Sequence, residues 1–111
     1  MNKTVLVPVA DGSEEIEAAT IIDVLRRAGL EVVVAACGPD LQITASRGVK
    51  LVADKRIADC RDQTFDAVVL PGGMPGAEHL RDCEPLIALL KAQKDAGRLY
   101  AAICAAPAVV L

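Results

Sequence analysis

The sequence has no tryptophan and only one phenylalanine and one tyrosine, so aromatic side chains cannot make up its core. More than half of the 111 residues are hydrophobic, and most of these are valine, leucine, isoleucine or alanine. A core of small and β-branched side chains is typical of a parallel sheet that helices cover on both faces. The length suits one domain of that kind, which we expect to span residues 1–111.

Several further absences exclude classes of function. No apolar run approaches the ~20 residues of a membrane-spanning helix, and the chain enters a strand at once, so we expect no signal peptide. The formal net charge is −3, which leaves no basic surface for nucleic acid. Neither G-x-G-x-x-G nor the phosphate loop G-x-x-x-x-G-K-[ST] occurs. We therefore expect no cofactor, no nucleic-acid partner and no membrane partner.

Cysteine and histidine are too few and too scattered for a zinc site. The four cysteines, at positions 37, 60, 83 and 104, form no C-x-x-C pair, and there is a single histidine. We therefore expect no bound metal, and a reduced protein of the cytoplasm is favoured. Cys60 lies in a polar connecting stretch and is expected to be inert.

Apolar runs alternate with stretches of helical periodicity along the chain. We expect long strands at residues 4–9, 31–36, 65–70 and 99–103, and helices that end at Gly29 and at about Gly97. Two shorter strands, 41–45 and 49–53, join at Ser46-Arg47-Gly48, and residues 54–64 are expected to be a connection. Strand–helix–strand units of this length predict parallel pairing with right-handed crossovers. The predicted fold class is α/β, with a doubly wound, mostly parallel sheet and helices on both faces.

Cys104 stands directly between an apolar strand and the start of a helix. A strand–Cys–helix junction needs small neighbours, and Ala102 and Ala106 lie two residues on either side. This layout parallels the G-x-S-x-G nucleophile elbow, in which a strained turn presents a nucleophile above the sheet. The alternative is a small buried cysteine that packs like an alanine. On the elbow interpretation, Cys104 is the only strongly reactive thiol of the four.

Three glutamates crowd the start of the first helix, where the helix dipole favours acids. Either Asp11 or Ser13 can cap this helix. Helical spacing places both Glu14 and Glu17 on the apolar face, so periodicity alone does not choose between them. The remaining alternative is that all three, Glu15 included, are solvated. Glu15→Ala is expected to have little effect on the oxidation of Cys104.

The loop after the third long strand has two adjacent glycines, Gly72 and Gly73. They permit positive φ angles and free their N–H groups for an anion or an oxyanion, although a tight turn is the simpler interpretation. Arg47 is either an anion contact or a solvated loop residue, and His79 is expected on the surface. The acidic helix, the glycine loop and Cys104 all follow strand ends, where ligands collect in open α/β sheets.

With these motifs in order, the chain resembles the ThiJ/PfpI superfamily, in the branch of the Parkinson's-disease-linked oxidative-stress protein, the protein deglycases and their bacterial relatives. The matching residues are Gly12-Ser13-Glu14-Glu15-Ile16-Glu17, Asp23 to Gly29, Ser46-Arg47, Val69-Leu70-Pro71-Gly72-Gly73, Gly76-Ala77 and Ala101-Ala102-Ile103-Cys104-Ala105-Ala106-Pro107. The resemblance implies a flavodoxin-like fold and a homodimer.

The resemblance also implies a role for each candidate site residue. Cys104 would be the reactive cysteine, and Glu17 the buried carboxyl that hydrogen-bonds its sulfur. Gly73 and Ala105 would supply backbone N–H groups to an oxyanion. The substrate pocket would include Gly72, Ala106 and Arg47, and Arg47 would reach toward the pocket of the partner subunit.

Two functions follow, and they use the same residues. The first is a cofactor-independent glyoxalase III or deglycase, which converts methylglyoxal or early glycation adducts to lactate through Cys104. The second is a redox-sensing stress protein or chaperone in which Cys104 is oxidised to sulfinate. A cysteine peptidase is a weaker alternative, because no adjacent Cys-His pair is visible.

In one respect the chain departs from the superfamily, whose members continue past the elbow helix. This sequence stops inside that helix, at Leu111. We therefore expect a fragment that lacks its C-terminal part and has a complementary C-terminal fragment as a partner. His79 does not align with the superfamily's downstream histidine.

Overall fold

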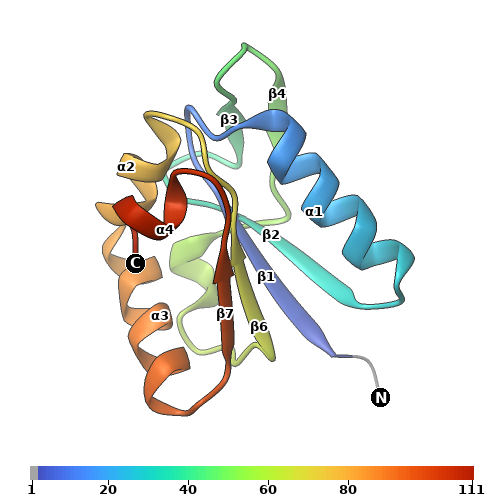
Figure 1. Ribbon diagram of the computed structural model, residues 1–111, viewed down its shortest axis with the longest axis vertical. Coiled ribbons are helices and arrows are strands. Elements are labelled where there is room, and N and C mark those ends of the chain that lie inside the picture. Colours follow the sequence, from blue (N-terminus) through green and yellow to red (C-terminus); the bar gives the residue numbers. More distant parts are fainter. Residues whose placement is uncertain (1–2) are drawn as a thin grey trace.

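The computed structural model describes residues 3–111 and is built around a five-stranded parallel sheet (Figure 1). The strand order is β5-β2-β1-β6-β7. The strands are β1 (Thr4–Val9), β2 (Glu31–Ala36), β5 (Lys55–Arg56), β6 (Ala67–Leu70) and β7 (Leu99–Ala102). A separate antiparallel hairpin, β3 (Gln42–Thr44) with β4 (Lys50–Val52), stands beside the carboxyl ends of the strands. The predicted flavodoxin-like α/β class is confirmed.

The order of the strands creates one crossover point, between β1 and β6. From β1 the chain first adds β2 on one side, in register from Thr4 opposite Glu31 to Val9 opposite Ala36. It later returns to the other side of β1 with β6, and β7 then pairs with β6. Ligands of doubly wound sheets bind at the carboxyl ends of strands flanking such a point.

Alternating side chains of β1 form two apolar layers, one on each face of the sheet. Val5, Val7 and Val9 pack against one helix, α1 (Glu15–Arg27). Leu6 packs on the opposite face, in the layer that contains residues of α2 (Gly76–Arg81), α3 (Glu84–Asp95) and α4 (Ala106–Val109). Figure 1 shows α1 on one side of the sheet and the other three helices on the opposite side.

Some boundaries differ from those expected. Residues 54–64 are not merely a connection, because they contain β5, which pairs with the end of β2, and the 3₁₀ helix Ile57–Cys60. The two residues of β5, Lys55 and Arg56, are both charged, so the sequence shows no strand signal there. The elbow helix α4 has only four residues. The cap of α1 is neither Asp11 nor Ser13: Glu14 accepts the Ile16 N–H, at 2.8 Å.

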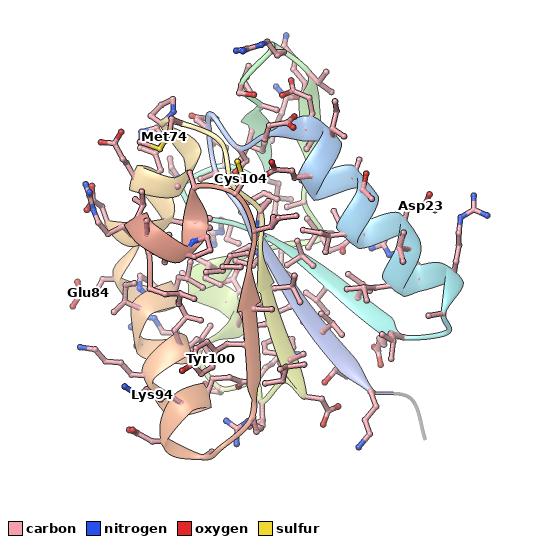
Figure 2. The ribbon with its side chains drawn as sticks, in the orientation of Figure 1. Asp23, Met74, Glu84, Lys94, Tyr100 and Cys104 are labelled. Carbon is pink, nitrogen blue, oxygen red and sulfur yellow. The ribbon has the colours of Figure 1, made fainter. Side chains whose placement is uncertain are left out.

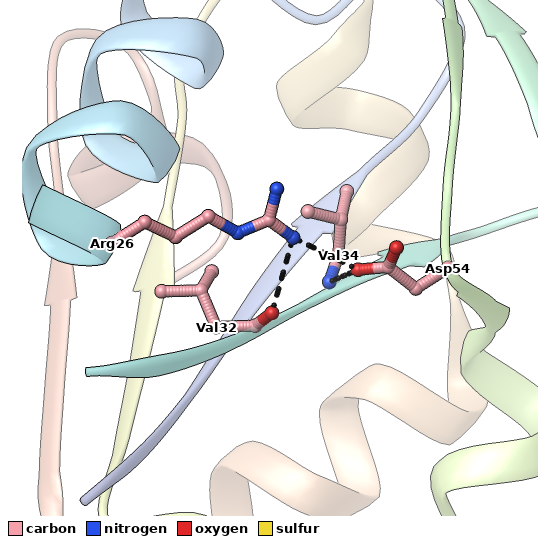
Figure 3. A network of polar contacts seen from close by, with 4 residues as sticks. All are labelled: Arg26, Val32, Val34 and Asp54. Atoms are coloured by element: carbon pink, nitrogen blue, oxygen red, sulfur yellow. Dashed lines mark hydrogen bonds and ion pairs between the residues drawn. The ribbon is translucent and has the colours of Figure 1, made fainter. Parts of the chain in front are cut away.

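The edge of β2 that β5 leaves unpaired is completed by side chains (Figure 3). The Arg26 guanidinium donates to the Val32 carbonyl and to the Asp54 carboxylate, both at 3.2 Å. Asp54 also accepts the Val34 N–H at 2.9 Å. The network therefore joins the end of α1 to the strand and to the chain that leaves the hairpin.

The other edge of the sheet, β7, carries exposed apolar side chains. Leu99 is 64% exposed and Tyr100 37%, and Ile103, just after the strand, is 48% exposed.

Among residues 3–111, no helix is long and apolar enough to cross a membrane.

Candidate functional site

Cys104 lies at a strained turn directly beyond β7. Its φ of +59° makes it the one non-glycine residue with positive φ among residues 3–111, and its side chain is exposed. The turn is tied down on both sides: the Ile103 N–H donates to the Leu70 carbonyl, and the Ala106 N–H donates to the Ile103 carbonyl. A strained residue held by its surroundings is typical of functional sites. Figure 2 shows Cys104 where the chain turns from β7 into α4, at the carboxyl ends of the strands.

Gly72 is the point at which Glu17 and Cys104 meet. Its N–H donates a 2.8 Å hydrogen bond to Glu17 Oε1. A Cβ atom on Gly72 would lie 2.7 Å from that oxygen, 2.8 Å from Cys104 Cβ and 2.9 Å from the Ile103 carbonyl oxygen. No side chain fits in this space, so glycine is required for the carboxyl and the cysteine to approach each other.

The three glutamates at the start of α1 separate into three roles. Glu14 caps the helix, and Glu17 turns toward Gly72. Glu15 binds the hairpin loop, accepting the Ser46 hydroxyl at 2.7 Å, the Arg47 N–H at 2.8 Å and the Val49 N–H at 3.2 Å. Sequence periodicity could not distinguish Glu14 from Glu17, because only the folded chain brings Gly72 against Glu17 and not against the Glu14 side chain.

The contacts of Glu15 contradict the view that it is simply solvated. Desolvation acts to raise its pKa, but the Ser46 hydroxyl and several backbone N–H groups outweigh it and lower the pKa from 4.5 to about 2. The ionised carboxylate therefore holds the hairpin against α1. Glu15 therefore has a structural role at the hairpin, and the expectation that Glu15→Ala does little to the oxidation of Cys104 stays a prediction.

The two expected oxyanion donors, Gly73 and Ala105, directly follow Gly72 and Cys104 in the sequence. Gly73 has a φ of +90°, and a Cβ there would lie 2.5 Å from the Glu14 nitrogen. Within residues 3–111, the N–H groups of Gly73 and Ala105 donate to no protein acceptor. Both are thus free to donate to a bound group. Loop geometry of this kind is not encoded by any single sequence motif.

The other two expected pocket residues, Ala106 and Arg47, differ in burial. Ala106 is fully buried, in the core layer beneath the elbow. Arg47 is exposed at the tip of the hairpin, and within residues 3–111 the one acceptor of its guanidinium is the Ser46 carbonyl, at 3.5 Å. His79 is exposed on α2, as expected, with Nδ1 2.6 Å from the Asp11 carbonyl oxygen.

The other cysteines are not alike. Cys60 is fully buried, and desolvation raises its pKa, so the structure supports the expectation that it is inert. Cys83 also stands at the start of a helix, because it occupies the N-cap position of α3. It lines one cleft with Cys37. The Glu84-Pro85 start of α3 was a sequence signal for the first point, but the proximity to Cys37 had none. Within residues 3–111, no three His, Cys, Asp or Glu side chains are grouped to hold a metal ion.

Comparison with known proteins gives one consistent result. The model of the DJ-1/PfpI family matches residues 3–111. Over 106 residues the chain is 53% identical to protein DJ-1 homolog B of Arabidopsis thaliana. The aligned region makes up 96% of this chain and 24% of that protein. The chain is 39% identical to a glutathione-independent glyoxalase of Caenorhabditis elegans, with coverages of 96% and 56%. Oxidised DJ-1 of Toxoplasma gondii superposes with a TM-score of 0.97 at 57% identity, with coverages of 98% and 59%. The chain thus spans between a quarter and three fifths of these relatives.

Proposed function

Because this chain belongs to the DJ-1/PfpI family, we propose that it carries the nucleophile of a cofactor-independent enzyme that acts on small reactive carbonyls. The observation that carries the proposal is the junction of Glu17, Gly72 and Cys104. It places an exposed thiol, a carboxyl and unpaired N–H donors at the carboxyl end of the sheet. The glutathione-independent glyoxalase among the relatives supports the choice of substrate class.

In the proposed reaction, the Cys104 thiolate adds to the aldehyde carbon of methylglyoxal and forms a hemithioacetal. The oxygen of that carbon gains negative charge, and the N–H groups of Gly73 and Ala105 stabilise it. Glu17 then transfers a proton from this carbon to its neighbour, which leaves a lactoyl thioester on the cysteine. Water hydrolyses the thioester, so lactate leaves and the thiol is restored. With an early glycation adduct as the substrate, an amine is released as well.

The test is lactate formation from methylglyoxal without glutathione. Intact-mass measurement of the native protein comes first, because it reveals whether a companion polypeptide copurifies, and the assay uses that native form. We expect turnover that Cys104→Ser abolishes. Cys60→Ser is the matched control, since Cys60 is buried away from the junction, and it should retain turnover. A folded native protein without turnover, or one unaffected by Cys104→Ser, would contradict the proposal.

A second candidate function is that of a redox-sensing stress protein in a reducing compartment such as the cytoplasm. Its support is the exposure of Cys104 and an oxidised relative that shares this fold. Peroxide would convert Cys104 to the sulfinate, which the same N–H groups and protonated Glu17 would stabilise. Accumulation of sulfinate without methylglyoxal turnover would favour this alternative. A peptidase is not favoured, because the one histidine is bonded to the Asp11 carbonyl.

We also propose a homodimer formed through α1 and the hairpin. Ile16 and Val52 are 73% and 70% exposed, and Val49 is 47% exposed. Glu15 joins the two elements, so Ile16 and Val49 belong to one surface. In such a dimer, Arg47 at the hairpin tip would reach the partner. The exposed β7 edge would be covered by a C-terminal segment or fragment. Val24, also in α1, is 55% exposed. Sedimentation should show a dimer for the wild type and a monomer for Val52→Asp and for Val24→Asp.

A further inference from the structure

A pair of cysteines lies outside the site described above. Cys37 directly follows β2, and Cys83 immediately precedes α3, so residues distant in the sequence meet at one end of the sheet. Both residues are partly buried, and each thiol is close enough to shift the pKa of the other. They line a cleft of about 340 Å³ together with Asp11, His79 and Asp82. A small solute that enters this cleft therefore meets both residues.

The two thiols have opposite tendencies to ionise. The hydrogen bond from Cys37, together with the Leu86 backbone N–H, lowers the pKa of Cys83 to about 7 against the effect of desolvation. The same hydrogen bond and burial raise the pKa of Cys37, which therefore stays protonated. The pair thus combines a thiolate, which is the reactive form of cysteine, with an adjacent thiol.

We propose that Cys83 and Cys37 form a second redox site, at which a hydroperoxide oxidises the pair to a disulfide. In the first step, the Cys83 sulfur attacks the peroxide O–O bond; hydrogen peroxide gives the Cys83 sulfenic acid and hydroxide. In the second step, the Cys37 sulfur attacks that sulfenic sulfur, and its proton leaves with the sulfenic oxygen as water. The two thiols lose two electrons, and the peroxide gains them.

The geometry favours this pair over the other cysteines as partners. Cys60 is fully buried, and Cys104 lies at the elbow beside Gly72, outside the set of residues that line this cleft. A disulfide requires the sulfur atoms to approach to about 2.05 Å, and Cys37 and Cys83 are the two cysteines that line the same cleft within residues 3–111. The proposal does not depend on the carbonyl chemistry of Cys104.

Trypsin separates all four cysteines, which makes the test direct. Cys37 falls in the peptide 28–47, Cys60 in 57–61, Cys83 in 82–91 and Cys104 in 99–111. The protein carrying Cys104→Ser is treated with one equivalent of hydrogen peroxide. We expect peptides 28–47 and 82–91 to become linked, with the loss of two hydrogen atoms, and dithiothreitol to separate them. If both peptides keep free thiols, the proposal is overturned.

The variants distinguish the roles of the two cysteines. With Cys37→Ser, the linked peptide is lost and dimedone traps Cys83 as its sulfenic acid. With Cys83→Ser, Cys37 stays reduced at the same dose. Equal trapping of the remaining cysteine in both variants would overturn the assignment of Cys83 as the attacking residue. Cys60→Ser is the matched control and should keep the full yield of linked peptide.

One measurement needs no substitution at the pair and so does not depend on the folding of variants. Sub-stoichiometric iodoacetamide should label Cys83 at least tenfold faster than Cys37, and peroxide pretreatment should remove both labels together. Labelling of Cys83 that persists after peroxide treatment would overturn the disulfide. Loss of methylglyoxal turnover, in contrast, bears only on Cys104.

Discussion

The backbone N–H of Gly72 donates a 2.8 Å hydrogen bond to Oε1 of Glu17. This contact fixes the carboxyl of the first helix against the loop that follows β6, beside the point between β1 and β6 where the strand order reverses. Cys104 approaches the same glycine from β7. Three segments that are separate in the sequence are therefore held together by the absence of one side chain.

Gly72→Ala should remove both stability and turnover. The added methyl group would lie 2.9 Å from the Ile103 carbonyl oxygen, which is backbone and cannot move aside without displacing the elbow. Overpacking of this kind costs about 1–3 kcal/mol. Chemical unfolding and lactate formation provide the measurements. Gly29→Ala is the control: its methyl group meets open space at a φ of +87°, so it should cost about 1–2 kcal/mol and leave turnover intact.

Glu17→Gln should separate proton transfer from structure. The amide oxygen can still accept the Gly72 N–H, so we expect little change in unfolding free energy. Without a transferable proton, turnover should fall by roughly 10²–10⁴-fold. Glu14→Gln is the matched control, because its oxygen still caps α1 and does not face Gly72. Equal turnover in the two variants would mean that Glu17 has only a structural role.

The stability of the chain should depend on Glu15 below neutral pH. Its pKa is about 2 in the folded chain, against 4.5 when unperturbed. Since folding lowers the pKa, the stabilisation is complete above about pH 4.5 and is lost as the pH falls from 4.5 toward 2. Thermal melts across this range should show wild type losing more stability than Glu15→Gln, with the two converging at the acid end. Parallel melts of both proteins would contradict the prediction. The exposed Glu84→Gln serves as the control.

Two thiols, rather than one, should react readily. Alkylation of Cys83 should increase with pH around a midpoint of about 7. Exposed Cys104 should also be labelled, and buried Cys60 should be labelled last. Peptide mapping after brief iodoacetamide treatment distinguishes them. If Cys60 reacts before Cys83 or Cys104, exposure and local hydrogen bonding do not control reactivity here.

The sequence predicted those strands that are continuous runs of apolar residues. Strands β1 and β2 were found at their expected residues, because each is a run of buried apolar side chains. It did not predict β5, whose two residues are Lys55 and Arg56 and which forms only because β2 offers an unpaired edge. The position of Cys104 in a turn between a strand and a helix was predicted from neighbouring residues alone, because such a turn is a local structure.

Features that depend on long-range contacts could not be derived from periodicity. Glu15 and Glu17 differ by two positions on one helix, yet one binds the hairpin and the other binds the glycine loop. Cys37 and Cys83 line one cleft at the ends of two elements that neither helical nor strand spacing relates. Such pairs become visible only when the order of the strands is known.

The last prediction concerns the exposed edge of the sheet. A positive φ at Cys104 persists only where its surroundings hold it. On one side the elbow is held by hydrogen bonds to Leu70 and Ile103, but the other side of β7 exposes Leu99 and Ile103. Residues 1–111 produced alone should therefore turn over methylglyoxal at least tenfold more slowly than a native form in which a further segment covers this edge. Addition of that segment should restore turnover and protect the Ile103 N–H from hydrogen exchange. Full turnover and a cooperative melt by residues 1–111 alone would show that contacts with β6 and α4 suffice to hold the elbow.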